Sequence, residues 1–227
     1  MLQEFGPSIW LADGPEVSFF GFPYPTRMAV VRLANGDLWI WSPVALDASL
    51  EQGITALGPV RHIVSPNKIH HLFMPEWCER WPDARVYASP GLAKRKPEVR
   101  FDADLGDEPD SAWEGEIDQV VFRGSPALEE VVFFHRESST AIVCDLIQRH
   151  DPDDHKGWRG FLMRADGLVG KDGSTPREWR LSFIRRTPAR EARERLLSWN
   201  PKRLLIAHGE CESTGAGQII ARVLDWM

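Results

Sequence analysis

Hydrophobic and polar positions in the first half of the chain predict a hairpin followed by a β-α-β unit. Apolar runs at residues 28–33 and 37–41 flank Asn35-Gly36, a pair typical of a two-residue β-hairpin. Asp47 can cap a helix whose apolar side chains recur on one stripe, at Leu50, Ile54 and Leu57. Gly58-Pro59 ends this helix before a short apolar strand at residues 62–64.

The second half again contains apolar runs typical of strands and apolar stripes typical of helices, which completes an α/β pattern. Continuous or alternating apolar runs predict strands at residues 85–88, 117–122, 131–134, 140–146 and 203–207. Helical stripes follow Thr187-Pro188 and end the chain, and a further helix is expected to start near His70 and His71, with Pro75 in its first turn. The acidic stretch 102–116 reads as a surface loop. Runs of strands, each closed by helices, predict two facing sheets sandwiched between helices.

Three of the predicted strands end in residues that can bind a metal. Strand 62–64 leads into the segment Ser65-Pro66-Asn67-Lys68-Ile69-His70-His71, a second strand ends at Asp145, and the last ends at His208-Gly209. Strand ends are where α/β proteins place their chemistry. Three imidazoles and one carboxylate suit Zn²⁺, although Fe²⁺, Mn²⁺ and Ni²⁺ accept the same ligands. Alternatively, these histidines have only a structural role, either at a polar rim of the protein surface or as hydrogen-bonded groups in the core.

The order of these elements resembles the metallo-β-lactamase fold, a four-layer αββα sandwich. In that family a Thr-His-x-His-x-Asp-His segment, a later strand-end Asp and a last strand-end His form a two-metal pocket. Ser65 falls on the Thr of the segment, Pro66 and Lys68 on its first two His, His70 on its Asp and His71 on its last His. Pro126 lies near the place of the remaining ligand of the first metal. The resemblance therefore implies one divalent metal, held by His70, His71, Asp145 and His208.

The resemblance also identifies two departures around this site. Ser42-Pro43 stands where the family has an Asp that supports the metal site, so an anchoring group is expected to be missing. Lys68, in place of a ligand, is either a surface lysine or a residue that binds an anionic group of a substrate. A branch of the superfamily, of unknown function, has a similar Pro-Asn-x-x-His-His segment and a similar terminal Ala-His-Gly.

Composition sets broader limits. A chain of 227 residues with 43% hydrophobic residues suits a single domain spanning residues 1–227. A net charge of -6 argues against nucleic acid as a partner, and no apolar run approaches the ~20 residues of a membrane span. With no leader pattern at the N-terminus and only three widely spaced cysteines, we expect a cytoplasmic protein without disulfides. Cys144 is expected to point away from Asp145, into the core.

Two features between residues 149 and 203 remain open. The stretch 149–178 is rich in Gly and Pro, as lids often are, and it begins with His150-Asp151-Pro152-Asp153-Asp154-His155, which is either a second metal cluster or an exposed turn. Residues 156–203 carry 13 Lys and Arg against 5 Asp and Glu. Such a basic segment is either a solvated face or a positive lid that attracts an anionic ligand.

These observations lead to one functional hypothesis and two competing ones. The first is a single-metal hydrolase that activates water to attack a small substrate, which the basic features suggest is anionic. The second is a non-catalytic binding or regulatory protein on a degenerate metallo-β-lactamase scaffold, which Pro66, Lys68, Ser42 and Pro126 favour. In the third, the histidines only stabilise the core. Nucleophilic catalysis and nucleotide binding lack their motifs, since neither a Gly-x-Ser-x-Gly elbow nor a glycine-rich phosphate loop occurs.

Overall fold

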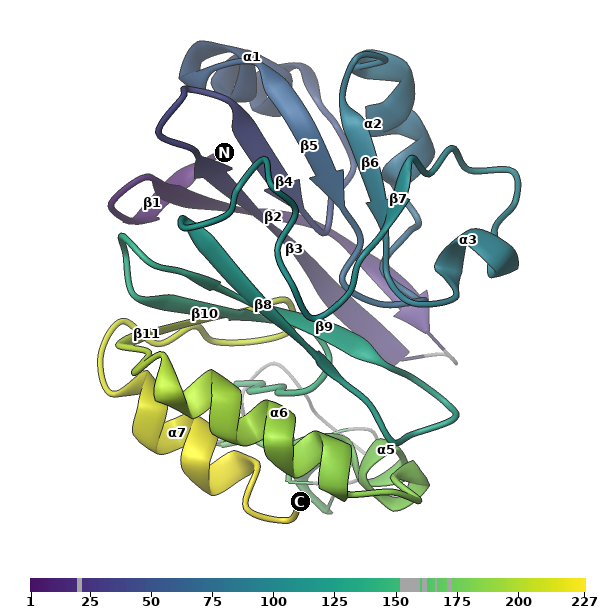
Figure 1. Cartoon of the computed structure of the whole chain (residues 1–227), viewed down its shortest axis with the longest axis vertical. Helices are drawn as coiled ribbons and strands as arrows, with labels where there is room; N and C mark the ends of the chain where they lie inside the picture. The colour runs from purple at the N-terminus through teal and green to yellow at the C-terminus, as the bar shows by residue number, and fades with distance from the viewer. Residues whose placement is uncertain (20–21, 152–159, 161–162, 166, 171–172) are drawn as a thin grey trace.

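The computed structural model contains two β-sheets that face each other, with helices on both outer sides (Figure 1). It describes the whole chain except residues 20–21, 152–159, 161–162, 166 and 171–172. These four layers confirm the predicted αββα arrangement. Among the described residues, no helix is long and apolar enough to cross a membrane.

The first sheet has seven strands, which lie in the order of the sequence. They are β1 (Gln3–Gly6), β2 (Ile9–Phe19), β3 (Phe22–Arg32), β4 (Leu38–Trp41), β5 (Val60–Val64), β6 (Arg85–Ala88) and β7 (Ala103–Asp104). β1 to β4 pair antiparallel, and β4 to β7 pair parallel. The parallel pairing places the carboxyl ends of β4, β5 and β6 at one edge of the sheet.

Three helices connect the strands of this sheet: α1 (Ala48–Leu57), α2 (Met74–Arg80) and α3 (Leu92–Arg95). As predicted, Asp47 caps α1, since its carboxylate accepts the N–H of Leu50 at 2.7 Å. α2 starts at Met74, later than expected, and residues 68–73 form turns. The side chain of Asn67 accepts the N–H groups of Ile69 and His70, so this segment is organised by a side chain and not by a helix start.

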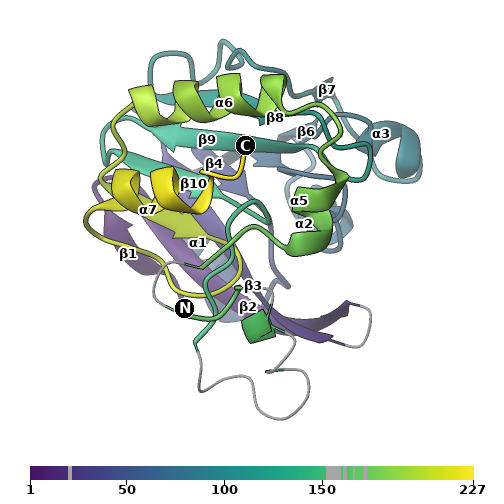
Figure 2. The same cartoon turned by 90° about the horizontal axis from the view of Figure 1, so that it is seen from below.

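The second sheet has four strands in the order β11-β10-β9-β8, and helices cover its outer face (Figure 2). The strands are β8 (Ile117–Phe122), β9 (Glu130–His135), β10 (Thr140–Val143) and β11 (Arg203–Ile206), and the helices are α5 (Arg177–Ser182), α6 (Thr187–Ser198) and α7 (Ala216–Val223). β10 ends at Val143 rather than at the predicted residue 146, because the next three N–H groups bond to the Glu130 side chain and not to a neighbouring strand.

The faces of the two sheets enclose a core rich in aromatic side chains. Trp39 meets Phe133 edge-to-face with ring centroids 5.0 Å apart, and Trp113 contacts Trp39 in the same manner at 6.2 Å. Trp113 belongs to the stretch that the sequence predicts as a surface loop, yet it is only 1% exposed. The prediction of a surface loop is wrong for part of this stretch, because Ala103–Asp104 form β7 and the side chains of Leu105 and Trp113 pack in the core between the sheets.

A buried network at the end of β9 gives a prediction for stability against pH. Burial lowers the pKa of His135 to about 4, while its ring bonds Ser138 at 2.7 Å. In the unfolded chain the His135 ring is protonated near pH 6.5, whereas in the folded protein it stays neutral down to about pH 4. The stabilisation that comes from the neutral ring is therefore complete above pH 6.5 and is lost as pH falls toward 4. We expect the free energy of unfolding to fall by up to about 3 kcal/mol more in the parent than in His135→Gln over this range. Denaturant unfolding at pH 7 and pH 4.5 checks this, and parallel pH profiles would contradict it.

Candidate metal site

Three side chains from the two sheets meet at one edge of the sandwich. His70 follows β5, Asp145 follows β10, and His208 follows β11. Nε2 of His70 lies 3.1 Å from Nε2 of His208 and 3.4 Å from Oδ2 of Asp145. Nε2 of His208 lies 3.3 Å from Oδ1 of Asp145. These strand ends therefore bring together three of the four residues predicted from the sequence.

The spacing of these three atoms suits one metal ion. Tetrahedral ligands at about 2.0–2.2 Å from Zn²⁺ are about 3.3–3.6 Å from one another, close to the separations between these atoms. Cys144 adds a possible fourth ligand, because its sulfur and the ligating atoms of the other three residues all lie within 4.8 Å of one another. Cys144 is buried in the core between the sheets, as expected, in the same cluster as Ile142. The expectation that it points away from the site is wrong, because its sulfur lies among the other candidate ligand atoms.

His70 is oriented by a serine at the end of β4. Oγ of Ser42 lies 2.8 Å from Nδ1 of His70, which leaves Nε2 directed at Asp145 and His208. Ser42 has a φ of 51°, a left-handed conformation that is uncommon for a non-glycine residue and is often found at functional sites. The anchor that the sequence appears to lack is therefore present, with Ser42 in the place of the family's Asp.

His208 is oriented by β3 of the other sheet. Its Nδ1 donates to the carbonyl of Pro25 at 2.7 Å, so the neutral ring presents a lone pair at Nε2. The guanidinium of Arg27 donates from Nη1 to the carbonyls of Ile206 and Gly209, on either side of His208. Tyr24 packs edge-on against the imidazole with ring centroids 5.3 Å apart. These contacts hold the last strand end against β3.

Asp145 is buried among hydrogen-bond donors. Asn67 donates from Nδ2 to Oδ2 at 2.7 Å, and Gln148 donates from Nε2 to Oδ1 at 3.3 Å. Burial raises the pKa of Asp145, but attraction to His70 and the hydrogen bonds that the His208 and His70 rings donate in their protonated forms outweigh it, so the pKa of Asp145 is held well below its usual range. The carboxylate is therefore ionised, as a metal ligand must be.

His71 is the one predicted ligand that the structure does not bring to this cluster. Its ring is not part of the group of potential ligand atoms, and burial lowers its pKa, as do the positive charges of Lys96 and Arg95. Adjacent residues in the turn point in different directions, and Asn67 fixes the turn so that His70 faces Asp145. We therefore replace His71 by Cys144 in the candidate ligand set.

Lys68 follows a different course from the other residues of the segment. Its side chain passes Gly91, where an added Cβ would lie 2.9 Å from Cε and 3.3 Å from Nζ of the lysine. Within the described part of the chain, its ammonium forms no ion pair, so it is free to meet an anionic ligand. Its binding role stays a prediction.

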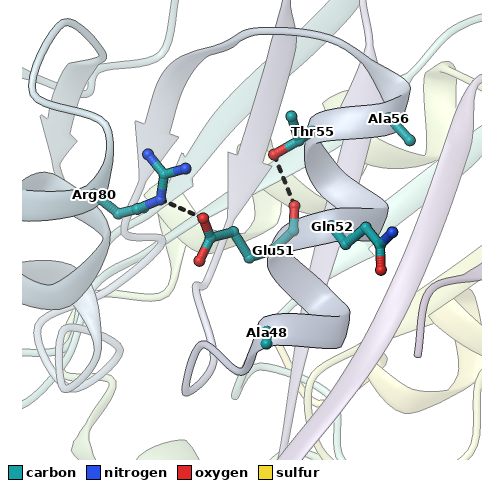
Figure 3. Close-up of a pocket in the computed structure, with 6 residues that line it drawn as sticks. All are labelled: Ala48, Glu51, Gln52, Thr55, Ala56 and Arg80. Atoms are coloured by element: carbon teal, nitrogen blue, oxygen red, sulfur yellow. Dashed lines mark hydrogen bonds and ion pairs between the residues drawn. The ribbon is translucent and has the colours of Figure 1, made fainter.

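Two other places in the molecule have features of a binding site. In the proposed second cluster, Asp153, Asp154 and His155 lie outside the described residues, while His150 is buried and bonds Gln148 at 3.3 Å. A hollow on α1 is lined by Ala48, Glu51, Gln52, Thr55, Ala56 and Arg80 (Figure 3). There the only metal-binding side chain, Glu51, is paired with Arg80 at 2.6 Å. The strand-end cluster is thus the candidate site.

The sequence predicts His70, His208 and Asp145 as candidate ligands but not the residues that orient them. Asn67 lies within the segment that carries the family resemblance, and Ser42 stands at a strand end, so both had a positional signal. Glu130 had none, because its neighbour Glu129 is the same residue and nothing in the sequence distinguishes the buried one.

Comparison with solved structures identifies the class of fold. The metallo-β-lactamase DIM-1 has a TM-score of 0.67 at 15% identity, with 99% of this chain and 96% of that chain covered. A metallo-β-lactamase from Erythrobacter litoralis also gives 0.67, at 12% identity with 100% and 96% covered. The enzyme FIM-1 from Pseudomonas aeruginosa, in its mono-zinc form, gives 0.63 at 12% identity with 99% and 94% covered. The chain thus has the metallo-β-lactamase fold.

The family itself follows from the sequence. Residues 8–153 match the family described as "Domain of unknown function (DUF4336)", and the chain belongs to this family. Among curated proteins, none matches the chain by sequence.

Proposed function

We propose that the protein is a hydrolase that depends on a single divalent metal ion, with Zn²⁺ the best match. His70, Asp145 and His208 would hold the ion, with Cys144 as the fourth candidate. The observation that carries this proposal is the set of separations of 3.1–3.4 Å between three ligating atoms from different strand ends. The mono-zinc form of FIM-1 supports a single-ion state on this fold.

Hydrogen bonds within the chain orient these candidate ligands in the absence of a metal ion. The hydrogen bond from Nδ1 of His208 to the carbonyl of Pro25 leaves a lone pair at Nε2 of the neutral ring. Oγ of Ser42 can accept a hydrogen bond from Nδ1–H of His70, and in that tautomer Nε2 of His70 also carries a lone pair. Asn67 and Gln148 donate hydrogen bonds to the Asp145 carboxylate and orient it. When bound, Zn²⁺ would supply water of lowered pKa for attack on an ester, amide or phosphoester.

The order Ser42–His70–Asp145 also matches a serine hydrolase triad, but burial argues against that chemistry. Ser42 is only 4% exposed, so a substrate carbonyl has little access to its Oγ. We therefore assign Ser42 to positioning His70. A serine-reactive fluorophosphonate should leave the protein unlabelled.

Elemental analysis of protein purified without chelator tests the proposal. We expect close to one transition-metal ion per chain, with the content unchanged in His71→Ala and lost in His70→Ala. Folded parent protein without metal would contradict the proposal, whereas loss of metal in His71→Ala alone would restore the ligand set predicted from the sequence. The loaded protein is then assayed with activated esters, amides and phosphoesters.

The non-catalytic alternative has one structural observation in its favour. The side chains of His70, Asp145 and His208 are only 11%, 8% and 5% exposed, which leaves little room for a substrate. Ligand binding without turnover of any substrate in the panel would favour this alternative.

We also propose that the substrate is a small anion that Lys68 helps to bind. The ammonium stands at the carboxyl edge of β5 and β6, beside the turn that carries His70, without an ion-pair partner among the described residues. Lys68→Met is expected to weaken the binding of phosphate or a small carboxylate by about 1–3 kcal/mol, the usual cost of losing a charge-assisted hydrogen bond. Calorimetric titration checks this, with Lys94→Met as a control lysine, and equal affinities would exclude a role for Lys68.

A further inference from the structure

The candidate ligands come from both sheets, so their spacing depends on how the sheets are held together. His70 lies on the turn after β5, in the seven-stranded sheet, whereas Asp145 and His208 follow β10 and β11 in the other. A shift of one sheet edge by about 1 Å would spoil the geometry of a metal site. Contacts between the turn that carries His70 and the turn that carries Asp145 therefore influence the spacing of the candidate ligands more than contacts within each sheet do.

Asn67 makes such contacts with both ends of its amide. Its Oδ1 accepts the N–H groups of Ile69 and His70 at 3.0 and 3.2 Å, which fixes the turn of the first sheet. Its Nδ2 donates to Asp145 at 2.7 Å and to Glu130 at 3.3 Å, both in the second sheet. Asn67 is fully buried, so water does not replace these bonds.

Glu130 is the matching group on the second sheet. It is fully buried at the start of β9, and Oε1 accepts the N–H of Cys144 at 2.8 Å. Oε2 accepts the N–H groups of Asp145 and Leu146 at 2.7 and 3.1 Å. The carboxylate thus shapes the turn that presents Asp145, and Asn67 and Glu130 also form a backbone bridge between the two sheets.

We propose that Asn67 and Glu130 form a buried pair of positioning residues that couples the His70 turn to the Asp145 turn and so sets the spacing of the metal ligands. The part that concerns metal rests on the proposed function. The coupling itself does not, because it follows from hydrogen bonds within the chain. The four hydrogen bonds to Glu130 all come from N–H donors, and both of its oxygens accept. A glutamine of equal size would oppose an NH₂ group to one or more of these donors.

Hydrogen exchange in the metal-free protein tests the coupling. In Glu130→Gln, we expect the amides of Ile69 and His70 to exchange about 10-fold faster or more, although Glu130 bonds neither of them directly. In the reciprocal variant Asn67→Asp, which keeps the acceptor for Ile69 and His70, the amides of residues 144–146 should exchange faster. Ser138→Ala, which removes a buried hydroxyl far from these turns, should change neither set.

The two variants, one on each turn, test the coupling independently. If Glu130→Gln does not fold, Asn67→Asp reports the same coupling from the other side. Faster exchange confined to the turn that carries the altered residue, in either variant, would overturn the proposal and leave each side chain with a local role.

Metal affinity tests the positioning role separately. For folded Glu130→Gln, we expect Zn²⁺ and Co²⁺ to bind about 10- to 100-fold more weakly than to the parent, with a changed Co²⁺ absorption spectrum, and we expect parental values for Ser138→Ala. Parental affinity and spectrum in Glu130→Gln would overturn the positioning role. If the parent itself binds no metal, the proposed function fails and positioning of a metal fails with it, whereas the exchange experiment still decides the coupling.

Discussion

The double variant Asp145→Ala, His208→Ala is expected to lose transition-metal binding altogether. It removes the only carboxylate of the candidate cluster and one of its two imidazoles, leaving His70 and Cys144. Two ligands seldom hold Zn²⁺ against water, since stable protein sites use three or four. Metal titration should show a loss in affinity of at least about 1000-fold, and elemental analysis should find none of the ion that the parent retains.

Two controls separate loss of ligands from loss of structure. His135→Ala removes a buried imidazole that bonds Ser138 and lies outside the cluster, so metal content should match the parent. Ser42→Ala keeps every ligand but removes the partner of His70 Nδ1, so we expect an intermediate loss in affinity of about 10- to 100-fold. Full metal content in the double variant would show that the ion binds elsewhere, and an equal loss in His135→Ala would point to unfolding.

Gly209→Ala is expected to lower the free energy of unfolding by about 2–5 kcal/mol and to weaken metal binding as well. Gly209 has a φ of 107°, and an added Cβ would lie 1.9 Å from the carbonyl oxygen of Arg149. That carbonyl accepts the N–H of Glu210 at 2.7 Å, so the backbone cannot move away without loss of this bond. Since Gly209 follows His208 directly, relief of the collision should displace the ligand.

Gly36→Ala is a matched control for this prediction. Gly36 has a φ of 91°, so alanine is strained there too, but nothing lies within 4 Å of the added Cβ. Chemical denaturation of both variants therefore separates the cost of the collision from the cost of the backbone conformation. Equal stability losses in the two variants, with parental metal affinity in Gly209→Ala, would contradict the prediction. They would show that the turn after His208 accommodates the added methyl group without displacing His208.

Local sequence pattern determined the elements and the place of the site. The strands, the capped helix α1 and the three strand ends with His or Asp follow from apolar periodicity and turn residues, which act over a few positions. Parallel pairing gathers strand ends at one edge within a sheet, which makes Asp145 after β10 and His208 after β11 neighbours. Their meeting with His70, after β5 of the other sheet, depends also on how the two sheets pack.

Only the tertiary structure decided which side chains within the turns face the site. The choice between His70 and His71 and the burial of Glu130 beside Glu129 fall in a turn and at the start of a strand, where no period predicts side-chain direction. Their directions are set by partners far along the chain, such as Asn67 for Asp145 and Ser42 for His70. Trp113 shows the same effect in the core, because its burial depends on space between two sheets that its own acidic surroundings do not reveal.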